Sequence, residues 1–475
     1  MKWEMLLCEK RKRGHNSEHT GTDPRDEFQK DYHRIIGSAS FRRLQDKTQV
    51  FPLDTSDFVR TRLTHSLETS SLAKSLGEMI FKYIIIKGRD TEVTEEVKSK
   101  ICSVLECAGL IHDIGNPPFG HFGEDLIRDW FIKNLPQKEY DGIKITERLT
   151  EQMQNDFYHF EGNAHALRLL TKLHFLVDEN GMNLTYTLLN TIIKYPVPST
   201  GINKKSGNIK DKKMGYFYAE KDIFDEITAA TGAVDCRHPL AFILEAADDI
   251  AYKTGDIEDA VKKGFISYQK LLGELRGDSY RGRCADSGEY EEYDRAVKKL
   301  ETCYGDDIKN GVSSPEKNAV QRWVIHVQGV LLKCAAFGFT RYYKEIMDGS
   351  FSKELLAVSH GNALAYALSD IAYRYVFTSE AIYRPEVSAA MIFEFLLDKF
   401  VSAAINYGDK TKMSPLDSRM TAFISENYKK AYERFSEGKD ENEKLYLRLL
   451  LVTDTICGMT DSYARRLYRE LNGIE

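Results

Sequence analysis

Apolar residues recur every three to four positions along most of the 475-residue chain, which is the period of an amphipathic α-helix. In one such stretch Leu67, Leu72, Leu76, Met79 and Ile80 lie near one face. The same period predicts helices over residues 64–87, 99–112, 124–134, 161–176, 238–252, 257–272, 315–347, 362–377, 386–405, 444–457 and 461–471.

Alternating patterns typical of strands are scarce. Residues 192–197 and 216–218 alternate enough to predict one short hairpin around the polar loop 199–213. This loop and residues 277–293 are rich in polar residues and glycine, and we expect both to be mobile. The pattern therefore predicts an all-α fold with one short β-hairpin at most.

The chain is long enough for two or three average domains, but neither polar segment is long enough to separate independent units. We expect residues 1–60 to pack on the core as an N-terminal segment. Residues 61–275 should form the core that carries the chemistry, and residues 276–475 a helical C-terminal region continuous with it.

Composition removes several classes of protein. The sequence has no apolar run of about 18 residues and no secretory signal, so we expect a cytoplasmic protein with no membrane partner. None of the eight cysteines forms a CxxC pair, which disfavours a zinc ribbon or a thioredoxin-like motif. The net charge of −6 argues against nucleic-acid binding over the whole surface, although it leaves room for local basic patches.

The segment 109–124, GLIHDIGNPPFGHFGE, is the most informative part of the sequence. His112 and Asp113 follow an apolar helix, and the glycines and prolines after them should return the chain with His121 and Glu124. A His-Asp dipeptide alone is weak evidence of function, and a capped helix end with a solvated pair is the alternative. Burying two unpaired ionisable groups would cost several kcal/mol, however, so partners are expected.

Two further residues complete a candidate metal site. His65 begins an amphipathic helix, and Asp248 lies inside an otherwise apolar one. The alternatives are a polar helix start and a structural ion pair. Together with His112 and Asp113 these residues form a mixed nitrogen and oxygen ligand set, which suits Mn²⁺, Mg²⁺, Fe²⁺, Ni²⁺, Co²⁺ or Zn²⁺ and disfavours a structural zinc site. Four ligands in octahedral geometry leave two positions for water and a phosphate oxygen.

At this point the sequence resembles a known family. His65, His112-Asp113 and Asp248 resemble the H…HD…D signature of HD-domain phosphohydrolases. Longer strings resemble the bacterial deoxyguanosinetriphosphate triphosphohydrolases, in order over essentially the whole chain: FRRLQDKTQVFP at 41–52, RTRLTHSLE at 60–68, HDIGNPPFGHFGE at 112–124, HFEGNAHALRLL at 159–170, EAADDIAY at 245–252 and GMTDSYARRLY at 458–468.

The resemblance implies an HD-domain helical fold over residues 61–275 with additional C-terminal helices. It also implies a reaction in which a dNTP and water give a 2′-deoxynucleoside and intact triphosphate, with dGTP as the expected preferred substrate and Mn²⁺ or Mg²⁺ as the expected metal. The nucleoside 5′-oxygen is a poor leaving group, so a general acid is needed beside it.

His121 is the natural candidate for that acid, with Glu124 three residues further on. The resemblance assigns catalysis to this pair, and leaves open which partner handles the water and which the leaving group. The alternative for His121 is a helix cap beside the site.

Cationic side chains should clamp the triphosphate. The candidates are the cations Arg62, Lys194 and Lys213 together with the neutral Tyr195; each lysine could instead be an ordinary solvated residue. Asn116 stands where some relatives carry another histidine, which agrees with the bacterial branch, and we place it on the substrate side.

The deoxyribose should be recognised by close packing and by hydrogen bonds to its 3′-hydroxyl. By resemblance Gln49, Tyr252 and Asp256 fit this role. Asp248, Tyr252 and Asp256 recur at i, i+4 and i+8, so they share one stripe if the helix continues. Gln45 competes with Gln49, and Tyr252 could be a core tyrosine.

Other functions stay open. An HD-type nucleotide phosphodiesterase or 5′-nucleotidase would keep the fold and the metal, whereas a nucleotide sensor without turnover should have lost a ligand or His121. By resemblance we also expect a homo-oligomer, hexameric in relatives, and single-stranded DNA as an effector. The basic residues Lys204, Lys205, Lys210, Lys212 and Lys213 could contribute to DNA binding or simply belong to a solvated loop.

Overall fold

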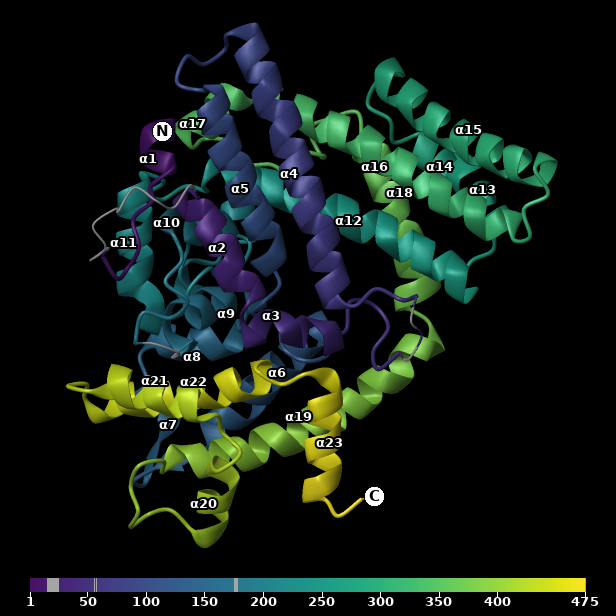
Figure 1. Cartoon of the computed structure of the whole chain (residues 1–475). Helices are drawn as coiled ribbons and strands as arrows, with labels where there is room; N and C mark the ends of the chain where they lie inside the picture. Colours follow the sequence, from purple (N-terminus) through teal and green to yellow (C-terminus); the bar gives the residue numbers. More distant parts are fainter. Residues whose placement is uncertain (15–24, 55, 57, 175–177, 475) are drawn as a thin grey trace.

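Helices make up nearly all of the regular structure in the computed structural model, which describes residues 1–14, 25–54, 56, 58–174 and 178–474 (Figure 1). Within these residues there is one sheet, in which β1 (Glu139–Tyr140) pairs antiparallel with β2 (Ile143–Lys144). The predicted all-α fold is therefore confirmed.

Four long helices form the centre of the molecule. The helix α4 (Arg62–Lys87) packs along both α5 (Glu95–Ile111) and α12 (Pro239–Lys263), and α16 (Pro315–Arg341) packs on α12 and α4 (Figure 1). The start of α4 is fixed by a capping box in which Thr61 and Thr64 exchange hydrogen bonds, which satisfies amide groups that a helix end otherwise leaves unpaired.

A glycine allows α4 and α5 to approach closely. A Cβ atom at Gly109 would lie 2.4 Å from the Cα atom of Ser70 on α4, so no larger residue fits without moving the backbone. This close contact between α4 and α5 lies three residues before His112. It therefore brings the end of α5 to the side of α4 that carries His65.

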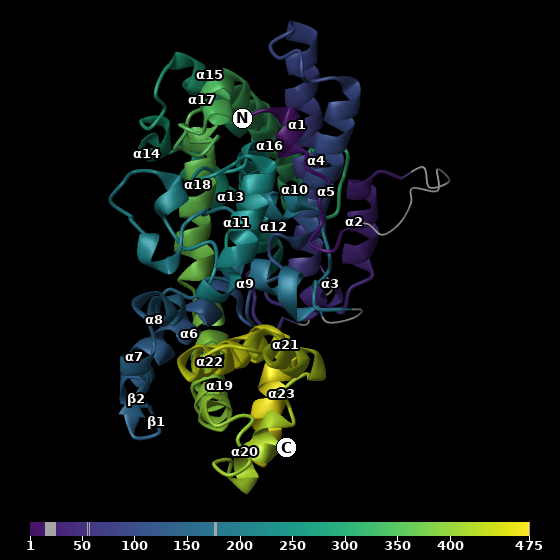
Figure 2. The ribbon, with the colours of Figure 1, turned by 90° about the vertical axis from the view of Figure 1, so that its left-hand side faces the viewer.

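The C-terminal helices form a layer at one end of the molecule, below the central helices in Figures 1 and 2. In this layer α19 (Glu380–Ile405) packs against α6 (Gly120–Asn134), α22 (Glu441–Cys457) and α23 (Asp461–Leu471). The C-terminal layer is thereby packed, through α19, against the helix that begins within the sequence motif of residues 112–124.

The remaining helical elements are shorter or lie around this frame. They are α1 (Trp3–Leu6), α2 (Glu27–Ile36), α3 (Ala39–Arg43), η1 (Leu44–Asp46), η2 (Leu135–Gln137), α7 (Ile145–Arg148), α8 (Glu151–Tyr158), α9 (Gly162–Arg168), η3 (Leu169–Leu173), α10 (Tyr186–Ile192), η4 (Ser199–Gly201), η5 (Ile209–Asp211), η6 (Tyr218–Glu220), α11 (Lys221–Thr231), α13 (Tyr268–Arg276), α14 (Asp278–Arg281), α15 (Ser287–Lys309), α17 (Tyr343–Asp348), α18 (Asn362–Ala372), η7 (Tyr373–Phe377), α20 (Pro415–Thr421) and α21 (Glu426–Ser436).

Several predicted boundaries were wrong. Separate helices were predicted over 238–252 and 257–272, but α12 continues through Gly255 and ends only at the left-handed Gly264. The last residues of the second predicted helix belong to α13. The segment 277–293, expected to be mobile, holds α14 and the start of α15. The helix predicted over 161–176 is divided into α9 and η3, and its last two residues lie outside the described part of the chain.

The predicted hairpin was also wrong. Residues 192–197 and 216–218 are fully described, and neither segment forms a strand. They do meet beside each other, because the amide of Gly215 donates to the carbonyl of Val197 at 3.0 Å. A longer ladder is prevented because Pro196 and Pro198 have no amide hydrogen to donate.

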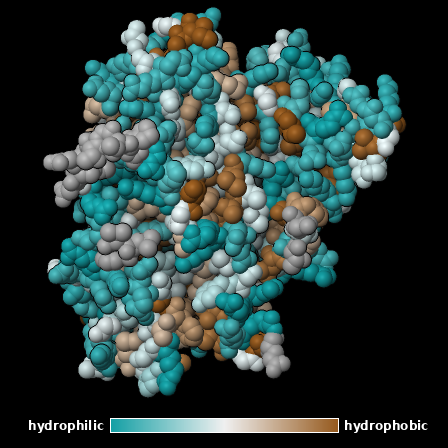
Figure 3. Space-filling view, in the orientation of Figure 1, coloured by the Kyte–Doolittle hydropathy of each residue, from teal (hydrophilic) through white to brown (hydrophobic). Residues whose placement is uncertain are grey.

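One described helix, α16, is long and apolar enough to cross a membrane by length and composition alone. In the structure, 67% of its most apolar window is buried against other helices, as in an ordinary core helix. The face drawn in Figure 3 is mostly hydrophilic, with smaller hydrophobic patches between the polar groups.

Candidate metal centre and active site

Three predicted metal ligands converge at the junction of α4 and α5. His65 on the first turn of α4 lies beside His112 and Asp113 at the end of α5, and one ligand atom from each lies within 4.8 Å of the others. Both imidazoles are buried. The site thus brings His65 next to two residues that lie 47 and 48 positions later in the sequence.

Asp248 joins this cluster from α12. Its Oδ1 atom lies 3.1 Å from His65 Nε2 and 3.2 Å from His112 Nε2, and its Oδ2 atom accepts a hydrogen bond from Lys194 Nζ at 2.8 Å. Burial opposes ionisation of Asp248, but Lys194 and His112 outweigh it and hold the pKa of this carboxyl well below its usual range. Asp248 is therefore a carboxylate aimed at both imidazoles.

The residues present fit a divalent cation, and His112 shows this best. Its Nδ1 atom lies 2.8 Å from the carbonyl of Gly109, which makes Nδ1 the protonated nitrogen. Its buried Nε2 atom has no hydrogen-bond partner, although it lies 3.4 Å from Asp113 Oδ2 and 3.2 Å from Asp248 Oδ1. The lone pair of His112 Nε2 therefore faces the carboxylates of Asp113 and Asp248, and a cation between these three groups would be bound by all of them.

The same crowding affects protonation. Burial lowers the pKa of His112, but Asp113 and Asp248 outweigh it and raise that pKa to about 10. The pocket thus attracts positive charge, and a metal ion can take the place of the proton.

Asp113 is oriented by two neighbours. Arg62 Nη1 is paired with Asp113 Oδ2, and Asn116 Nδ2 donates to Asp113 Oδ1 at 2.9 Å. The other two nitrogens of Arg62 donate to the carbonyl of Thr48 at 2.9 and 3.2 Å. In this arrangement Arg62 and Asn116, both predicted to contact substrate, hold the candidate metal ligand Asp113 in place.

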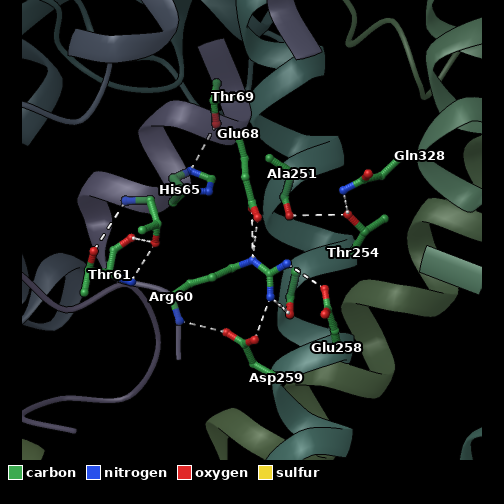
Figure 4. Close-up of polar contacts among 12 residues, drawn as sticks. Arg60, Thr61, His65, Glu68, Thr69, Ala251, Thr254, Glu258, Asp259 and Gln328 are labelled. Carbon is green, nitrogen blue, oxygen red and sulfur yellow. Dashed lines mark hydrogen bonds and ion pairs between the residues drawn. The ribbon is translucent and has the colours of Figure 1, made fainter. Parts of the chain in front are cut away.

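Arg60 ties together the two helices that carry His65 and Asp248 (Figure 4). Its guanidinium group contacts Glu68 on α4, and on α12 it contacts Glu258 and Asp259, both at 2.6 Å. Multiple charge-assisted hydrogen bonds of this kind fix relative position more firmly than a single exposed pair. This role is not predictable from sequence spacing, because Arg60 and its partners on α12 lie 198 and 199 positions apart.

His121 and Glu124 lie on the first turns of α6. His121 Nδ1 is 3.0 Å from Glu124 Oε2, and this hydrogen bond is the main cause that raises the pKa of His121. Glu124 Oε1 accepts a hydrogen bond from the amide of Gly162 at 2.7 Å. A Cβ atom at Gly162 would lie 2.1 Å from Asn116 Oδ1, so only glycine lets this chain approach the turn.

A buried glutamate beside this pair was missed at the level of sequence. Glu161 accepts hydrogen bonds from Lys213 Nζ at 2.9 Å and from Asn163 Nδ2 at 2.8 Å. Burial raises its pKa, and the nearby Glu124 raises it further. Lys213 is thus held near the His121–Glu124 pair by Glu161. The string HFEGNAHALRLL contains Glu161 but does not indicate this role.

The residues predicted to contact the deoxyribose offer unpaired polar atoms. Gln49 Oε1 and Asp256 Oδ2 are buried without a hydrogen-bond partner among the described residues. Asp256 and Tyr252 lie on α12 beyond Asp248, as the i, i+4, i+8 spacing predicted. Burial raises the pKa of Asp256 well above its usual value, so this carboxyl can hold a proton.

Tyr195 lies beside the metal cluster, whereas a cavity near the C-terminus lies apart from it. Tyr195 is buried beside Lys194, and burial raises its pKa. Arg466 lines a cavity of about 370 Å³ with Arg43, Tyr428 and Tyr463, and this cavity shares no residue with the metal cluster.

Comparisons with known proteins agree with this geometry. The HD domain family matches residues 62–180, which contain three of the four proposed ligands. The chain is 46% identical to a deoxyguanosinetriphosphate triphosphohydrolase-like protein of Listeria monocytogenes and 32% identical to one of Synechocystis sp., with both chains fully covered in each case. It is also 32% identical to a deoxyguanosinetriphosphate triphosphohydrolase of Yersinia pestis, over 94% of each chain.

The helical fold, the His–His–Asp cluster and the matched region define an HD-domain protein with a divalent metal site. Because the similarity extends over the full length of relatives in several bacteria, the chain belongs to the deoxyguanosinetriphosphate triphosphohydrolase family.

Proposed function

We propose that this protein is a metal-dependent dNTP triphosphohydrolase. In the proposed reaction the oxygen of water forms a bond to the α-phosphorus and the bond from that phosphorus to O5′ breaks. The products are a 2′-deoxynucleoside, whose O5′ takes up a proton, and intact triphosphate. The observation that carries the proposal is the orphaned Nε2 of His112 between two carboxylates, a short distance along the chain from the His121–Glu124 pair.

His65, His112, Asp113 and Asp248 would hold the metal, with Mn²⁺ or Mg²⁺ as the proposed ion. When bound, a divalent cation supplies Lewis acidity toward a phosphate oxygen and increases the acidity of water. Arg62 and Asn116 hold the Asp113 carboxylate, and Lys194 holds Asp248, so the donor atoms are fixed before any ligand arrives.

Lys194, Lys213 and Tyr195 are the proposed phosphate contacts. Lys194 and Lys213 are both paired with carboxylates, Asp248 and Glu161, at 2.8 and 2.9 Å. A triphosphate carries several negative charges, and it can share or replace these carboxylate partners. Their positions beside the metal cluster and the His121–Glu124 pair support this role.

His121 is the proposed proton donor to the leaving oxygen. Its imidazole is 74% exposed whereas Glu124 is buried, so the acid is open to a ligand and its partner is shielded. Glu124 raises the pKa of His121 through their hydrogen bond, which favours the protonated form that a donor needs.

Gln49, Tyr252 and Asp256 are the proposed deoxyribose contacts. A hydroxyl that satisfies a buried unpaired atom gains about 1–3 kcal/mol over an analogue that does not. A preference for dGTP among the four dNTPs is part of the proposal, and so are a homo-oligomer and single-stranded DNA as an effector. Light scattering and DNA titration of the rate would test the last two.

Product analysis tests the proposed function. The protein should be incubated with each dNTP and with GTP, with Mn²⁺ or Mg²⁺, and the products separated by chromatography. The expected products are deoxynucleoside and triphosphate in equal amounts, with no product from His112→Ala. Orthophosphate from a monophosphate would favour the nucleotidase alternative, and cleavage of a phosphodiester would favour the phosphodiesterase.

A further inference from the structure

The carboxylate of Asp461, at the start of α23, contacts two separate segments of the candidate site. Its Oδ1 atom accepts a hydrogen bond from the amide of Phe119 at 3.0 Å. Its Oδ2 atom accepts from the amide of Thr48 at 3.0 Å and also from the Thr48 hydroxyl. Asp461 is 2% exposed, so these contacts are shielded from water.

The contact with Thr48 connects Asp461 to the proposed metal ligand Asp113. The carbonyl of Thr48 accepts hydrogen bonds from Nε and Nη2 of Arg62, and Nη1 of Arg62 is paired with Asp113. The position of Asp461 is therefore transmitted to a proposed metal ligand through Thr48 and Arg62.

The contact with Phe119 connects Asp461 to the start of α6, which carries the proposed acid His121. Phe119 is a non-glycine residue in the left-handed region, with φ 60°, and it is the N-cap of α6. A residue in this region needs its surroundings to hold it there. The hydrogen bond from its amide to Asp461 does so at the point where α6 begins, two residues before His121.

We propose that Asp461 is a positioning residue that holds the Arg62–Asp113 pair and the turn before His121 in one fixed arrangement. It is a positioning residue and not a catalytic one, because both of its carboxylate oxygens are buried and already accept hydrogen bonds from Phe119 and Thr48. The rate measurement that tests it rests on the proposed function, whereas the metal-binding measurement does not.

Lys47 forms a second connection between the C-terminal helices and the turn before α6, and it does not depend on Asp461. Lys47 Nζ donates to the carbonyl of Asn116 at 2.6 Å and to the carbonyl of Cys457, at the end of α22, at 2.7 Å. This bridge joins the same two parts of the molecule by a separate route. A variant at Asp461 is thus expected to fold.

The test is Asp461→Asn. Asparagine has the same shape but offers one acceptor oxygen and one NH₂ group, so the NH₂ group must face an amide donor of Thr48 or Phe119. We expect kcat for dGTP to fall at least tenfold. We expect the affinity for Mn²⁺, titrated calorimetrically into nucleotide-free protein, to fall about tenfold or more, because the change displaces Arg62, a direct partner of the proposed ligand Asp113.

Asp31→Asn is the matched control. Asp31 is also buried, and its Oδ2 atom also accepts from the amide and the hydroxyl of one threonine, Thr185, at 3.0 and 2.7 Å. It lies on α2, away from the metal cluster. We expect this control to keep kcat and Mn²⁺ affinity within twofold of wild type, even where its melting temperature falls as far as that of Asp461→Asn.

The proposal is overturned if either kcat or Mn²⁺ affinity of Asp461→Asn stays within twofold of wild type, or if Asp31→Asn loses as much. If wild type does not hydrolyse dNTPs, the proposed function fails and the Mn²⁺ titration alone decides this proposal. If Asp461→Asn does not fold, Thr48→Val and Thr48→Ser replace it. Serine keeps the hydroxyl donor and should retain at least threefold more of the Mn²⁺ affinity than valine; equal losses would overturn the proposal.

Discussion

His121 and Glu124 form a hydrogen bond of 3.0 Å between an exposed imidazole and a buried carboxylate. The other oxygen of Glu124 is fixed by the amide of Gly162. The carboxylate is therefore immobile, and the imidazole on its outer side is the group that can meet a ligand. This relationship is the basis of the first two predictions.

The first prediction concerns pH. Because the bond to Glu124 raises the pKa of His121, the imidazole stays protonated to higher pH, and activity that needs this proton is lost as pH rises through the raised pKa. Glu124→Gln removes the charge, so the alkaline limb of the kcat profile should move to lower pH. Asp125→Asn, an exposed neighbour, is the control. An unmoved limb in Glu124→Gln would contradict the assignment.

The second prediction separates acid catalysis from metal binding. His121→Ala should lower kcat by about 10²–10⁴, the usual contribution of a general acid, and should leave Mn²⁺ affinity unchanged. Single-turnover rates and calorimetry measure the two quantities. His326→Ala, at an exposed histidine on α16, controls for loss of an imidazole. Full activity in His121→Ala would rule out the proposed acid.

The third prediction concerns the metal. Removing the cation with a chelator should abolish turnover, and adding Mn²⁺ should restore it. His112→Ala and Asp113→Ala should bind no Mn²⁺ and recover no activity, because each removes one of four converging donors. Turnover that persists after chelation, in protein shown to contain no metal, would contradict a metal-dependent reaction.

The fourth prediction concerns the sugar. Asp256→Ala should lower kcat/KM for dGTP at least tenfold, because the buried carboxyl has an oxygen without a partner that a hydroxyl can satisfy. The ratio of kcat/KM for dGTP over GTP should fall as well. Asp222→Ala, at an exposed aspartate on α11, is the control for loss of a carboxyl group away from the site. Equal ratios in wild type and Asp256→Ala would contradict the proposed contact.

The fifth prediction concerns stability. Burial raises the pKa of Asp156 to about 7, although it accepts hydrogen bonds from Ser199, Tyr446 and the amide of Tyr218. An unfolded aspartate ionises near pH 4, so between about pH 4 and 7 the folded protein keeps a proton that the unfolded chain has lost. The stability that this retained proton gives the folded protein is lost as pH rises through that window.

The free energy of unfolding of wild type, relative to Asp156→Asn, should therefore fall by up to about 4 kcal/mol from pH 4 to pH 7. Urea unfolding at several pH values measures this difference. Asp440→Asn, an exposed helix cap, should show no such dependence. A constant difference between wild type and Asp156→Asn would contradict the raised pKa.

Much of the site could be predicted because its residues lie in local patterns. The stripe of Asp248, Tyr252 and Asp256 follows from helical spacing, and it is intact because α12 continues through Gly255. The turn that returns His121 follows from the glycines and prolines after Asp113. Both features depend on residues within about ten positions of each other.

The rest depends on contacts between distant segments. Sequence spacing does not indicate that Asp461 meets Thr48, 413 positions earlier, or that Lys213 pairs with Glu161. It also did not show that Arg62 and Asn116 orient Asp113. The hairpin was wrongly predicted because alternation alone does not reveal that two prolines remove the donors a ladder needs.

The most direct test of the reaction is hydrolysis of dGTP in H₂¹⁸O with Mn²⁺, followed by mass spectrometry of both products. Attack of water on the α-phosphorus predicts one ¹⁸O atom in intact triphosphate and none in deoxyguanosine. Label in deoxyguanosine, or label in orthophosphate with dGDP as the other product, would contradict the proposed cleavage of the bond between the α-phosphorus and O5′.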